Sequence, residues 1–191
     1  MRLFAAILPP PDVLDELCAF IAPYQAEWPD LRWTDRELLH VTLTFYGEVD
    51  DRTLERLLPR LERAVARHGP LNLSLAGAGA FPGNGAHARV LWTGLYGDRR
   101  DLARLSAATT AAGRRVGAPG TPPDAPARVY RPHLTLARTR RPVDVRPIIE
   151  PMSAFAGSPW TATEVHLMQS RFAARDRRQP LYESLKSWPL T

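Results

Sequence analysis

The stretch HVTL at residues 40–43 recurs in nearly the same form, as HLTL, at residues 133–136. Alternate side chains of an extended chain share a face, so each stretch places its His and its Thr on the same side of a strand. By composition, Thr follows a given His at this spacing about one time in twenty, which makes two occurrences in one chain unexpected. A single His and Thr in a strand are most often packing or cross-strand residues, whereas the duplication favours a shared chemical role.

The two stretches together supply two imidazoles, His40 and His133, and two hydroxyls, Thr42 and Thr135. Facing each other across a cleft, these groups suit a phosphate. Hydroxyls donate to phosphoryl oxygens, one neutral imidazole takes a proton from water, and one imidazolium protonates a leaving oxygen. A metal site is the main alternative, but it needs a third and a fourth ligand, and Thr stands beside both motifs instead. We therefore expect no metal and no cofactor.

The composition indicates one folded domain with an anionic partner. Hydrophobic residues make up 45% of the 191 residues, enough to bury a core. The net charge is +5 and Lys186 is the sole lysine. Arginine suits phosphate recognition, although a GC-rich genome produces the same bias. Prolines at 9–11 interrupt the start before a signal-peptide core could form, and no apolar run matches a membrane span, so we expect a cytoplasmic protein.

Hydrophobic periodicity predicts an α+β domain of two similar lobes, each holding one motif strand. Helices are expected after the prolines at 9–11, from residue 51, and over 101–116, where apolar residues recur at helical spacing. The expected strands are 3–8, 31–33, the first motif through residue 45, 71–75, 89–95, the second motif, 164–169 and 181–188. Connecting segments are predicted as a Gly/Pro-rich turn at 77–85, a surface loop at 117–127 and a basic turn at 174–179.

At the two motifs the chain resembles the 2H phosphoesterase superfamily, which is defined by paired His-x-Thr/Ser-x motifs. In detail it is similar to the bacterial and archaeal RNA 2',3'-cyclic phosphodiesterases, a family first described as 2'-5' RNA ligases. The resemblance covers nearly the whole chain. Besides the motifs, it rests on residues 2–7, Trp33, 45–49, 79–82, 89–92, 130–132, Arg138 and 188–190.

The resemblance implies a single bilobal domain over residues 1–191, with two antiparallel sheets lining a central groove and helices outside. It also implies hydrolysis of a 2',3'-cyclic phosphate at an RNA end to a 2'-phosphate, together with reversible 2'-5' RNA ligation. His40 would be the proton donor to the departing 3'-oxygen and His133 the proton acceptor that activates water. Thr42 and Thr135 would bind the phosphate. From sequence alone a pseudo-symmetric pair of histidines cannot be ordered into acid and base.

Two arginines compete for a role beside the second motif. Simple alternation places Arg131 on the His133 face of the strand and Arg138 on the opposite face. The family resemblance favours Arg138, while the alternation favours Arg131. Either side chain could contact a phosphate or an RNA backbone.

Three further candidates for substrate binding are Phe45, Tyr46 and His87. The two aromatic rings could stack on a base, although aromatic residues at such positions are more commonly part of a core. His87 lies in a glycine-rich turn, and loops of this kind often approach ligands.

The expected partner is an RNA with a 2',3'-cyclic phosphate end, such as a tRNA fragment, or a nucleotide. We expect a monomer without a membrane partner. Three alternatives remain open at this point: a module that binds RNA ends or nucleotides without turnover, a ligase that joins 2'-5' ends, and a hydrolase of small nucleoside cyclic phosphates.

Overall fold

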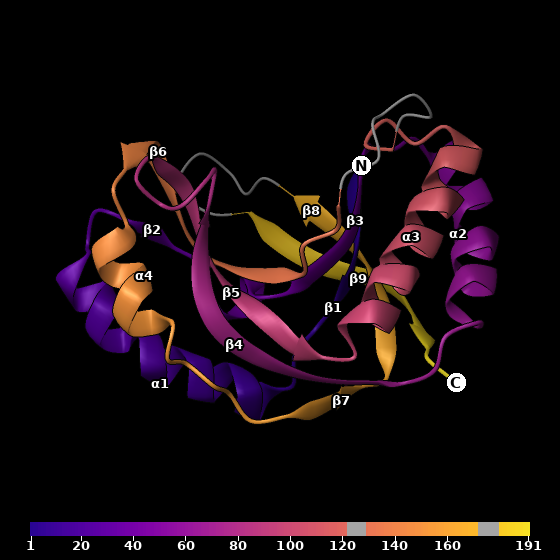
Figure 1. The fold of residues 1–191 in the computed structure, drawn as a ribbon. Helices are drawn as coiled ribbons and strands as arrows, with labels where there is room; N and C mark the ends of the chain where they lie inside the picture. Colours follow the sequence, from indigo (N-terminus) through magenta and orange to yellow (C-terminus); the bar gives the residue numbers. More distant parts are fainter. Residues whose placement is uncertain (122–128, 172–179) are drawn as a thin grey trace.

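The computed structural model describes residues 1–121, 129–171 and 180–191 (Figure 1). The predicted turn at 174–179 lies outside these residues, as does the predicted loop from residue 122 to 127. The chain forms an α+β structure in which a curled antiparallel sheet separates two pairs of helices (Figure 1).

Most of the predicted helices and strands are present, with two additions that the sequence did not indicate. The short helix α4 and the short strand β7 lie between the second motif and the C-terminal strands. The elements are β1 (Arg2–Ile7), α1 (Pro11–Glu27), β2 (Arg32–Trp33), the 3₁₀ turn η1 (Arg36–Leu38), β3 (Val41–Glu48), α2 (Asp51–Val65), β4 (Leu71–Phe81), β5 (Ala88–Gly97), α3 (Arg99–Val116), β6 (His133–Val143), α4 (Arg146–Met152), β7 (Trp160–Ala162), β8 (Glu164–Arg171) and β9 (Leu181–Pro189).

The strands form one continuous sheet rather than the two sheets that the resemblance implied. The order is β7-β4-β5-β6-β3-β1-β8-β9, and β2 pairs with β6. The two halves join at a seam between β3 and β6, where a single residue pair, Val41 and Leu134, is in register. Because β3 and β6 share only this one residue pair, each half of the chain can form its own lobe. The hydrogen-bonded sheet is nevertheless continuous from one half to the other.

The seam pairs equivalent positions of the two motifs. Val41 and Leu134 are the second residues of HVTL and HLTL, and both side chains are fully buried. An antiparallel register centred on this pair sets each His across from the Thr of the other strand. The hydroxyl of Tyr130 strengthens the join by donating to the carbonyl oxygen of Thr42 at 2.9 Å.

The central strand β1 separates the main core from the floor of a groove. Leu3, Ala5 and Ile7 belong to the main core, whereas Phe4 and Ala6 form a second, smaller apolar cluster with Met168. Because successive side chains point to opposite faces, one strand serves both.

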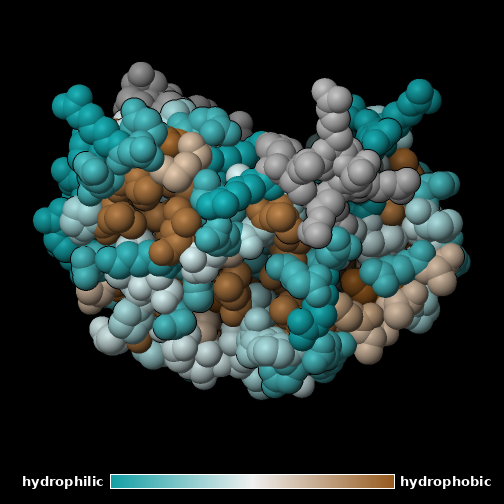
Figure 2. All heavy atoms as spheres, turned by 180° about the vertical axis from the view of Figure 1, so that it is seen from behind, coloured by the Kyte–Doolittle hydropathy of each residue, from teal (hydrophilic) through white to brown (hydrophobic). Residues whose placement is uncertain are grey.

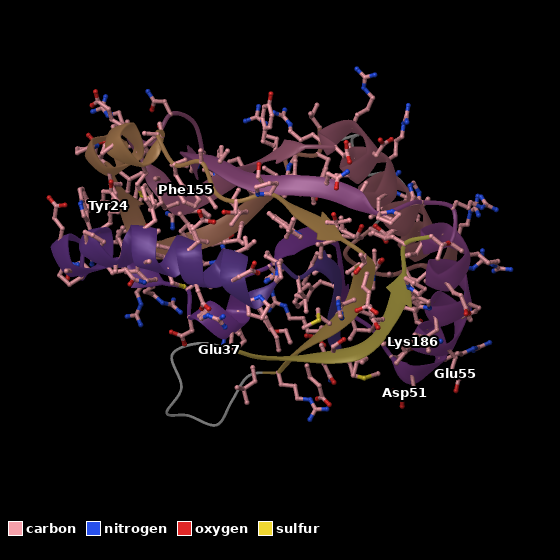
Figure 3. The ribbon with its side chains drawn as sticks, turned by 90° about the horizontal axis from the view of Figure 1, so that it is seen from below. Tyr24, Glu37, Asp51, Glu55, Phe155 and Lys186 are labelled. Atoms are coloured by element: carbon pink, nitrogen blue, oxygen red, sulfur yellow. The ribbon has the colours of Figure 1, made fainter. Side chains whose placement is uncertain are left out.

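Helices close the outer side of the sheet at both ends. At one end α2 and α3 lie side by side, and α1 and α4 lie at the other (Figure 1). Helix α3 packs behind β3, where the Ser106 hydroxyl donates to the Leu43 carbonyl at 2.7 Å. Near α1, the ring of Phe155 lies 4.5 Å from that of Phe20, on the side of α1 where Tyr24 also lies (Figure 3).

Strand β4 extends to Phe81, through the first part of the turn predicted at 77–85. Its pairing with β5 shifts between Ala76 and Gly79, so the chain absorbs a bulge and continues as a strand. Gly79 is required there because a Cβ at this position would come within 2.2 Å of the Trp92 side chain. Gly79, which contributed to the predicted turn, instead makes room for an aromatic ring.

Within the described ranges, no helix is both long and apolar enough to cross a membrane. The face opposite to that of Figure 1 carries its hydrophobic residues in separate patches divided by hydrophilic side chains (Figure 2).

Candidate active site

Both motifs open into one groove of about 430 Å³ on the face of the sheet away from α3. His40, Thr42, His133 and Thr135 all line it, as the duplicated pattern predicted. The other lining residues come from the strands on either side and from the segment before the first motif: Arg2, Phe4, Thr34, Leu38, Phe45, Arg138, Ser170, Pro180 and Tyr182.

The two imidazoles are held in equivalent ways. Nδ1 of His40 lies 2.7 Å from the carbonyl oxygen of Leu38, and Nδ1 of His133 lies 2.7 Å from that of Arg131. Each carbonyl belongs to the residue two positions before its His, and it fixes the tautomer with the proton on Nδ1. The Nε2 atoms are thereby left for chemistry. Nε2 of His40 lies 3.0 Å from the Thr42 hydroxyl oxygen, which places His and Thr together as the strand alternation predicted.

Aromatic rings pack around each histidine. The His40 ring lies 4.8 Å from Phe4 and 5.3 Å from Tyr182. The His133 ring lies 5.0 Å from Phe81 and 6.2 Å from Trp92. These rings restrict the orientation of the imidazoles and displace water from them, so both histidines are preorganised before a substrate enters.

Burial favours the neutral form of both histidines. Burial lowers the pKa of His40 to about 4, with smaller contributions in the same direction from Arg138 and His133. Burial also lowers the pKa of His133, and Arg138 again acts in the same direction. The groove thus combines the guanidinium of Arg138 with two uncharged imidazoles, an arrangement that favours an anionic ligand.

Arg138 lies in the groove because β6 contains a bulge. Its pairing with β5 shifts between Leu91, opposite Ala137, and Trp92, opposite Thr135. Leu136 is therefore an extra residue, and Leu136 and Ala137 are both fully buried in succession. The bulge reverses the alternation beyond it, which returns Arg138 to the face of His133. Simple alternation placed Arg138 on the wrong face, and its role in substrate binding, which the resemblance favours, stays a prediction.

The first motif strand repeats this irregularity. Leu43 and Thr44 are both buried in succession, and the pairing of β3 with β1 shifts at this point. Phe45 consequently faces the groove, three residues after Thr42, as Arg138 does three residues after Thr135. The guanidinium of Arg2 lies 5.1 Å above the Phe45 ring. Phe45 therefore lines the groove rather than the core, and its contact with a ligand stays a prediction.

Three predicted contacts are not in the groove. Tyr46 is fully buried, and its hydroxyl donates to the Thr109 carbonyl at 3.2 Å, so it is a core residue beneath α3. His87 is exposed in the turn between β4 and β5, beside Asp144. The side chain of Arg131 is exposed and does not line the groove. Only its backbone carbonyl contributes to the site, as the partner of His133 Nδ1.

Sequence reasoning missed several lining residues, most notably Arg2, Phe4 and Tyr182. Arg2 and Phe4 are two residues apart on β1 and therefore share a face. That face could have been assigned to the groove only from the pairing of β1 with the first motif strand. Tyr182 lies on β9, which reaches the groove through β8, and nothing in its local sequence indicates that position. In residues 1–121, 129–171 and 180–191, no three His, Cys, Asp or Glu side chains gather as metal ligands would.

Two His-x-Thr strands that meet in one groove of a curled antiparallel sheet define a two-histidine phosphoesterase arrangement. The model of the 2'-5' RNA ligase superfamily matches residues 11–171, and the chain belongs to this family.

Relatives match over nearly the whole chain. A protein of Methanocaldococcus jannaschii named RNA 2',3'-cyclic phosphodiesterase is 27% identical over 98% of this chain and 100% of its own. One of Archaeoglobus fulgidus with the same name is 28% identical over 97% of this chain and 98% of its own. Among solved structures, apo LigT of E. coli matches with a TM-score of 0.78 at 26% identity, covering 100% of this chain and 97% of that one. LigT has also been solved with 3'-AMP and with ATP.

Proposed function

We propose that this protein hydrolyses the 2',3'-cyclic phosphate at an RNA end to a 2'-phosphate, without a metal. The observation that carries the proposal is the equivalent placement of His40 and His133, each with Nδ1 at a backbone carbonyl and Nε2 left for the groove. A ligand-binding module would need the hydroxyls and the arginine, but it would need no pair of matched imidazoles.

In the proposed reaction, Nε2 of His133 takes a proton from a water molecule as its oxygen attacks phosphorus. The bond from phosphorus to the 3'-oxygen breaks, and the electron pair goes to that oxygen, which takes a proton from Nε2 of His40. Thr42 and Thr135 donate to the non-bridging oxygens, and Arg138 balances their charge. The ring opens to a 2'-phosphate and a free 3'-hydroxyl. With the 5'-hydroxyl of a second RNA in place of water, the same groups would join the two RNAs through a 2'-5' phosphodiester: His133 takes the proton of that hydroxyl, and the 3'-oxygen leaves with a proton from His40.

The negative charge of the substrate favours the protonated histidine that this mechanism needs. Burial alone depresses the pKa of both histidines, with that of His40 at about 4. A bound phosphate anion stabilises a cationic imidazole and raises its pKa, so one histidine becomes charged as the substrate enters. We assign the proton to His40, the proton donor that the family resemblance implies, and the neutral form to His133.

The test is turnover of an RNA oligomer that ends in a 2',3'-cyclic phosphate, measured in EDTA, with the product position assigned by phosphorus NMR. The proposal predicts hydrolysis and a 2'-phosphate. A 3'-phosphate would contradict the direction of ring opening, and loss of activity in EDTA that added metal restores would contradict metal independence. Turnover of small nucleoside cyclic phosphates alone would move the substrate class away from RNA. Tight binding without turnover would favour the binding module.

A further inference from the structure

A second groove, of about 350 Å³, lies between α2 and α3. Its lining is confined to two residue types, arginine and alanine. The residues are Arg60, Arg63 and Ala64 from α2, Arg67 from the turn that follows α2, and Ala108, Ala111, Ala112 and Arg115 from α3. We name this surface the α2–α3 arginine groove. The catalytic histidines do not contribute to it, since the catalytic groove lies on the face of β3 away from α3.

The spacing shows that each helix presents one continuous face to this groove. On α3 the lining residues follow the pattern i, i+3, i+4 and i+7, which is one face of an α-helix. On α2 they follow i, i+3 and i+4, and Arg67 lies two residues past the end of that helix at Val65. From Ala108 to Arg115 the α3 face is about 10 Å long, a length over which one strand of a nucleic acid duplex carries about three phosphates. The alanines leave the floor shallow, so a polymer backbone can approach the helices closely.

The basic and the acidic residues of α2 lie on different sides of the helix, whereas exposure to solvent alone would allow them to be mixed. Its four arginines, Arg52, Arg56, Arg60 and Arg63, fall within a sector of roughly 80° around the helix axis. Its three acidic residues, Asp51, Glu55 and Glu62, occupy a separate sector of roughly 40°. In Figure 3, the labelled Asp51 and Glu55 lie on the side of α2 where β9 and Lys186 run. The acids are therefore kept away from the arginine face that borders α3.

The arginines of the groove also lack partners. Within the described ranges, Arg60, Arg63, Arg67 and Arg115 make no hydrogen bond and no ion pair. Arg104, one turn before Ala108 on α3, is by contrast paired with Asp101 at 2.8 Å. Four unpaired guanidinium groups around one cavity repel each other, and a polyanion would relieve that repulsion.

We propose that the α2–α3 arginine groove binds the sugar-phosphate backbone of RNA, independently of sequence and away from the reacting end. The choice of RNA among polyanions rests on the proposed function. Arginine forks match phosphate oxygens, and the groove offers no aromatic ring for base stacking, so the contact would be made to the backbone alone. The RNA would thus be held at two places, its end in the catalytic groove and its body against α2 and α3.

The experiment compares two triple variants that remove the same charge. The groove variant is Arg63→Ala, Arg67→Ala and Arg115→Ala, all exposed side chains whose loss opens no core. The control is Arg99→Ala, Arg100→Ala and Arg114→Ala, which are exposed on α3 outside the groove. The probe is a single-stranded RNA of about 20 nucleotides with a 3'-hydroxyl, which is not a substrate, and binding is followed by fluorescence anisotropy across salt concentrations.

We expect the groove variant to bind this RNA about tenfold more weakly and to lose about 2 from its salt slope, while the control stays within about twofold of the unmodified protein. Equal losses in both variants would show general charge attraction and overturn the proposal. Unchanged binding in the groove variant would do the same. A fall in heparin binding as large as the fall in RNA binding would assign the groove to polyanions in general.

A second readout separates this proposal from the proposed function. Turnover of a dinucleotide with a cyclic phosphate end, too short to reach both grooves, should be unchanged in the groove variant. If the unmodified protein turns over no cyclic phosphate but the groove variant alone loses RNA binding, the proposed function fails and the RNA groove stands. If turnover is present and the groove variant binds RNA as tightly as the unmodified protein, the proposed function stands and the proposed RNA groove fails.

Discussion

At the scale of single residues, the groove lined by both motifs holds two histidines that burial keeps neutral. His40 has a pKa of about 4 in the folded protein, against an ordinary value near 6.5. Between these two values the unfolded chain takes up a proton that the folded protein excludes. The free energy of unfolding must therefore fall as the pH drops from about 6.5 towards about 4.

The buried His40 should account for a loss of stability on the order of 2 kcal/mol between about pH 7 and about pH 4.5. Denaturant unfolding at the two pH values measures this loss, and His40→Gln, which does not titrate, should show a correspondingly smaller one. Equal losses in the two proteins would contradict a depressed His40 pKa.

Arg138 and Arg131 give a second comparison between single residues. Arg138 lines the groove and lowers the pKa of both histidines, whereas the side chain of Arg131 does not line it. Arg138→Ala should reduce kcat/KM for the cyclic phosphate by about 10²-fold, because a charge-assisted contact to phosphate is lost. Arg131→Ala should stay within about twofold in the same steady-state assay. A larger loss for Arg131→Ala than for Arg138→Ala would contradict the placement of the Arg138 side chain in the groove by the bulge in β6.

At the scale of elements, the sequence predicted the motif strands and the long helices from their periodicity, and it failed where periodicity is locally broken. Alternation assumes a regular strand, but Leu136 and Leu43 are each followed by a second buried residue. These bulges exchange the two faces of the strand beyond them, which is why Arg138 was assigned to the wrong face by alternation. A bulge depends on the partner strand, so the local sequence carries little sign of it.

Tyr46 was misjudged for a related reason, since its burial depends on a helix far along the chain. Its ring occupies the space that Gly113 leaves on α3: a Cβ at Gly113 would lie 2.7 Å from the Tyr46 ring. The signal that could have identified Tyr46 as a core residue is therefore a glycine in α3, which no local pattern links to β3.

Gly113→Ala tests this contact between helix and strand. Alanine favours a helix, but the buried Tyr46 ring cannot move aside, so we expect a net loss of about 1 to 3 kcal/mol in the free energy of unfolding. Gly69→Ala is the matched control, because nothing lies within 4 Å of the added Cβ there. Thermal or denaturant unfolding measures both variants. Wild-type stability in Gly113→Ala would contradict the packing of α3 on β3.

At the scale of the whole molecule, the two motifs predicted that two chain halves meet at one site, but they did not reveal how. The expectation of two sheets is natural when each half carries its own strands. The structure instead joins them through Val41 and Leu134, and one main core cluster extends from β1 to β8. A seam of one residue pair has no distinct sequence pattern, because any two buried strand residues can form it.

A continuous sheet over one core predicts that the protein unfolds as a single unit. Calorimetry and circular dichroism should show one transition, with a van't Hoff enthalpy equal to the calorimetric enthalpy. Two separated transitions would mean that the halves on either side of the seam are independent domains, contrary to the single domain that we propose.

The central claim is that His40 and His133 together transfer the protons that open the cyclic phosphate. Its most direct test is the turnover of a cyclic-phosphate RNA by His40→Ala and by His133→Ala, beside His87→Ala as a control outside the groove. The account predicts losses of about 10²- to 10⁴-fold for each groove histidine and a change within about twofold for His87→Ala. Turnover near the wild-type rate in either groove variant, with the protein folded, would remove that histidine from catalysis and contradict the two-histidine mechanism.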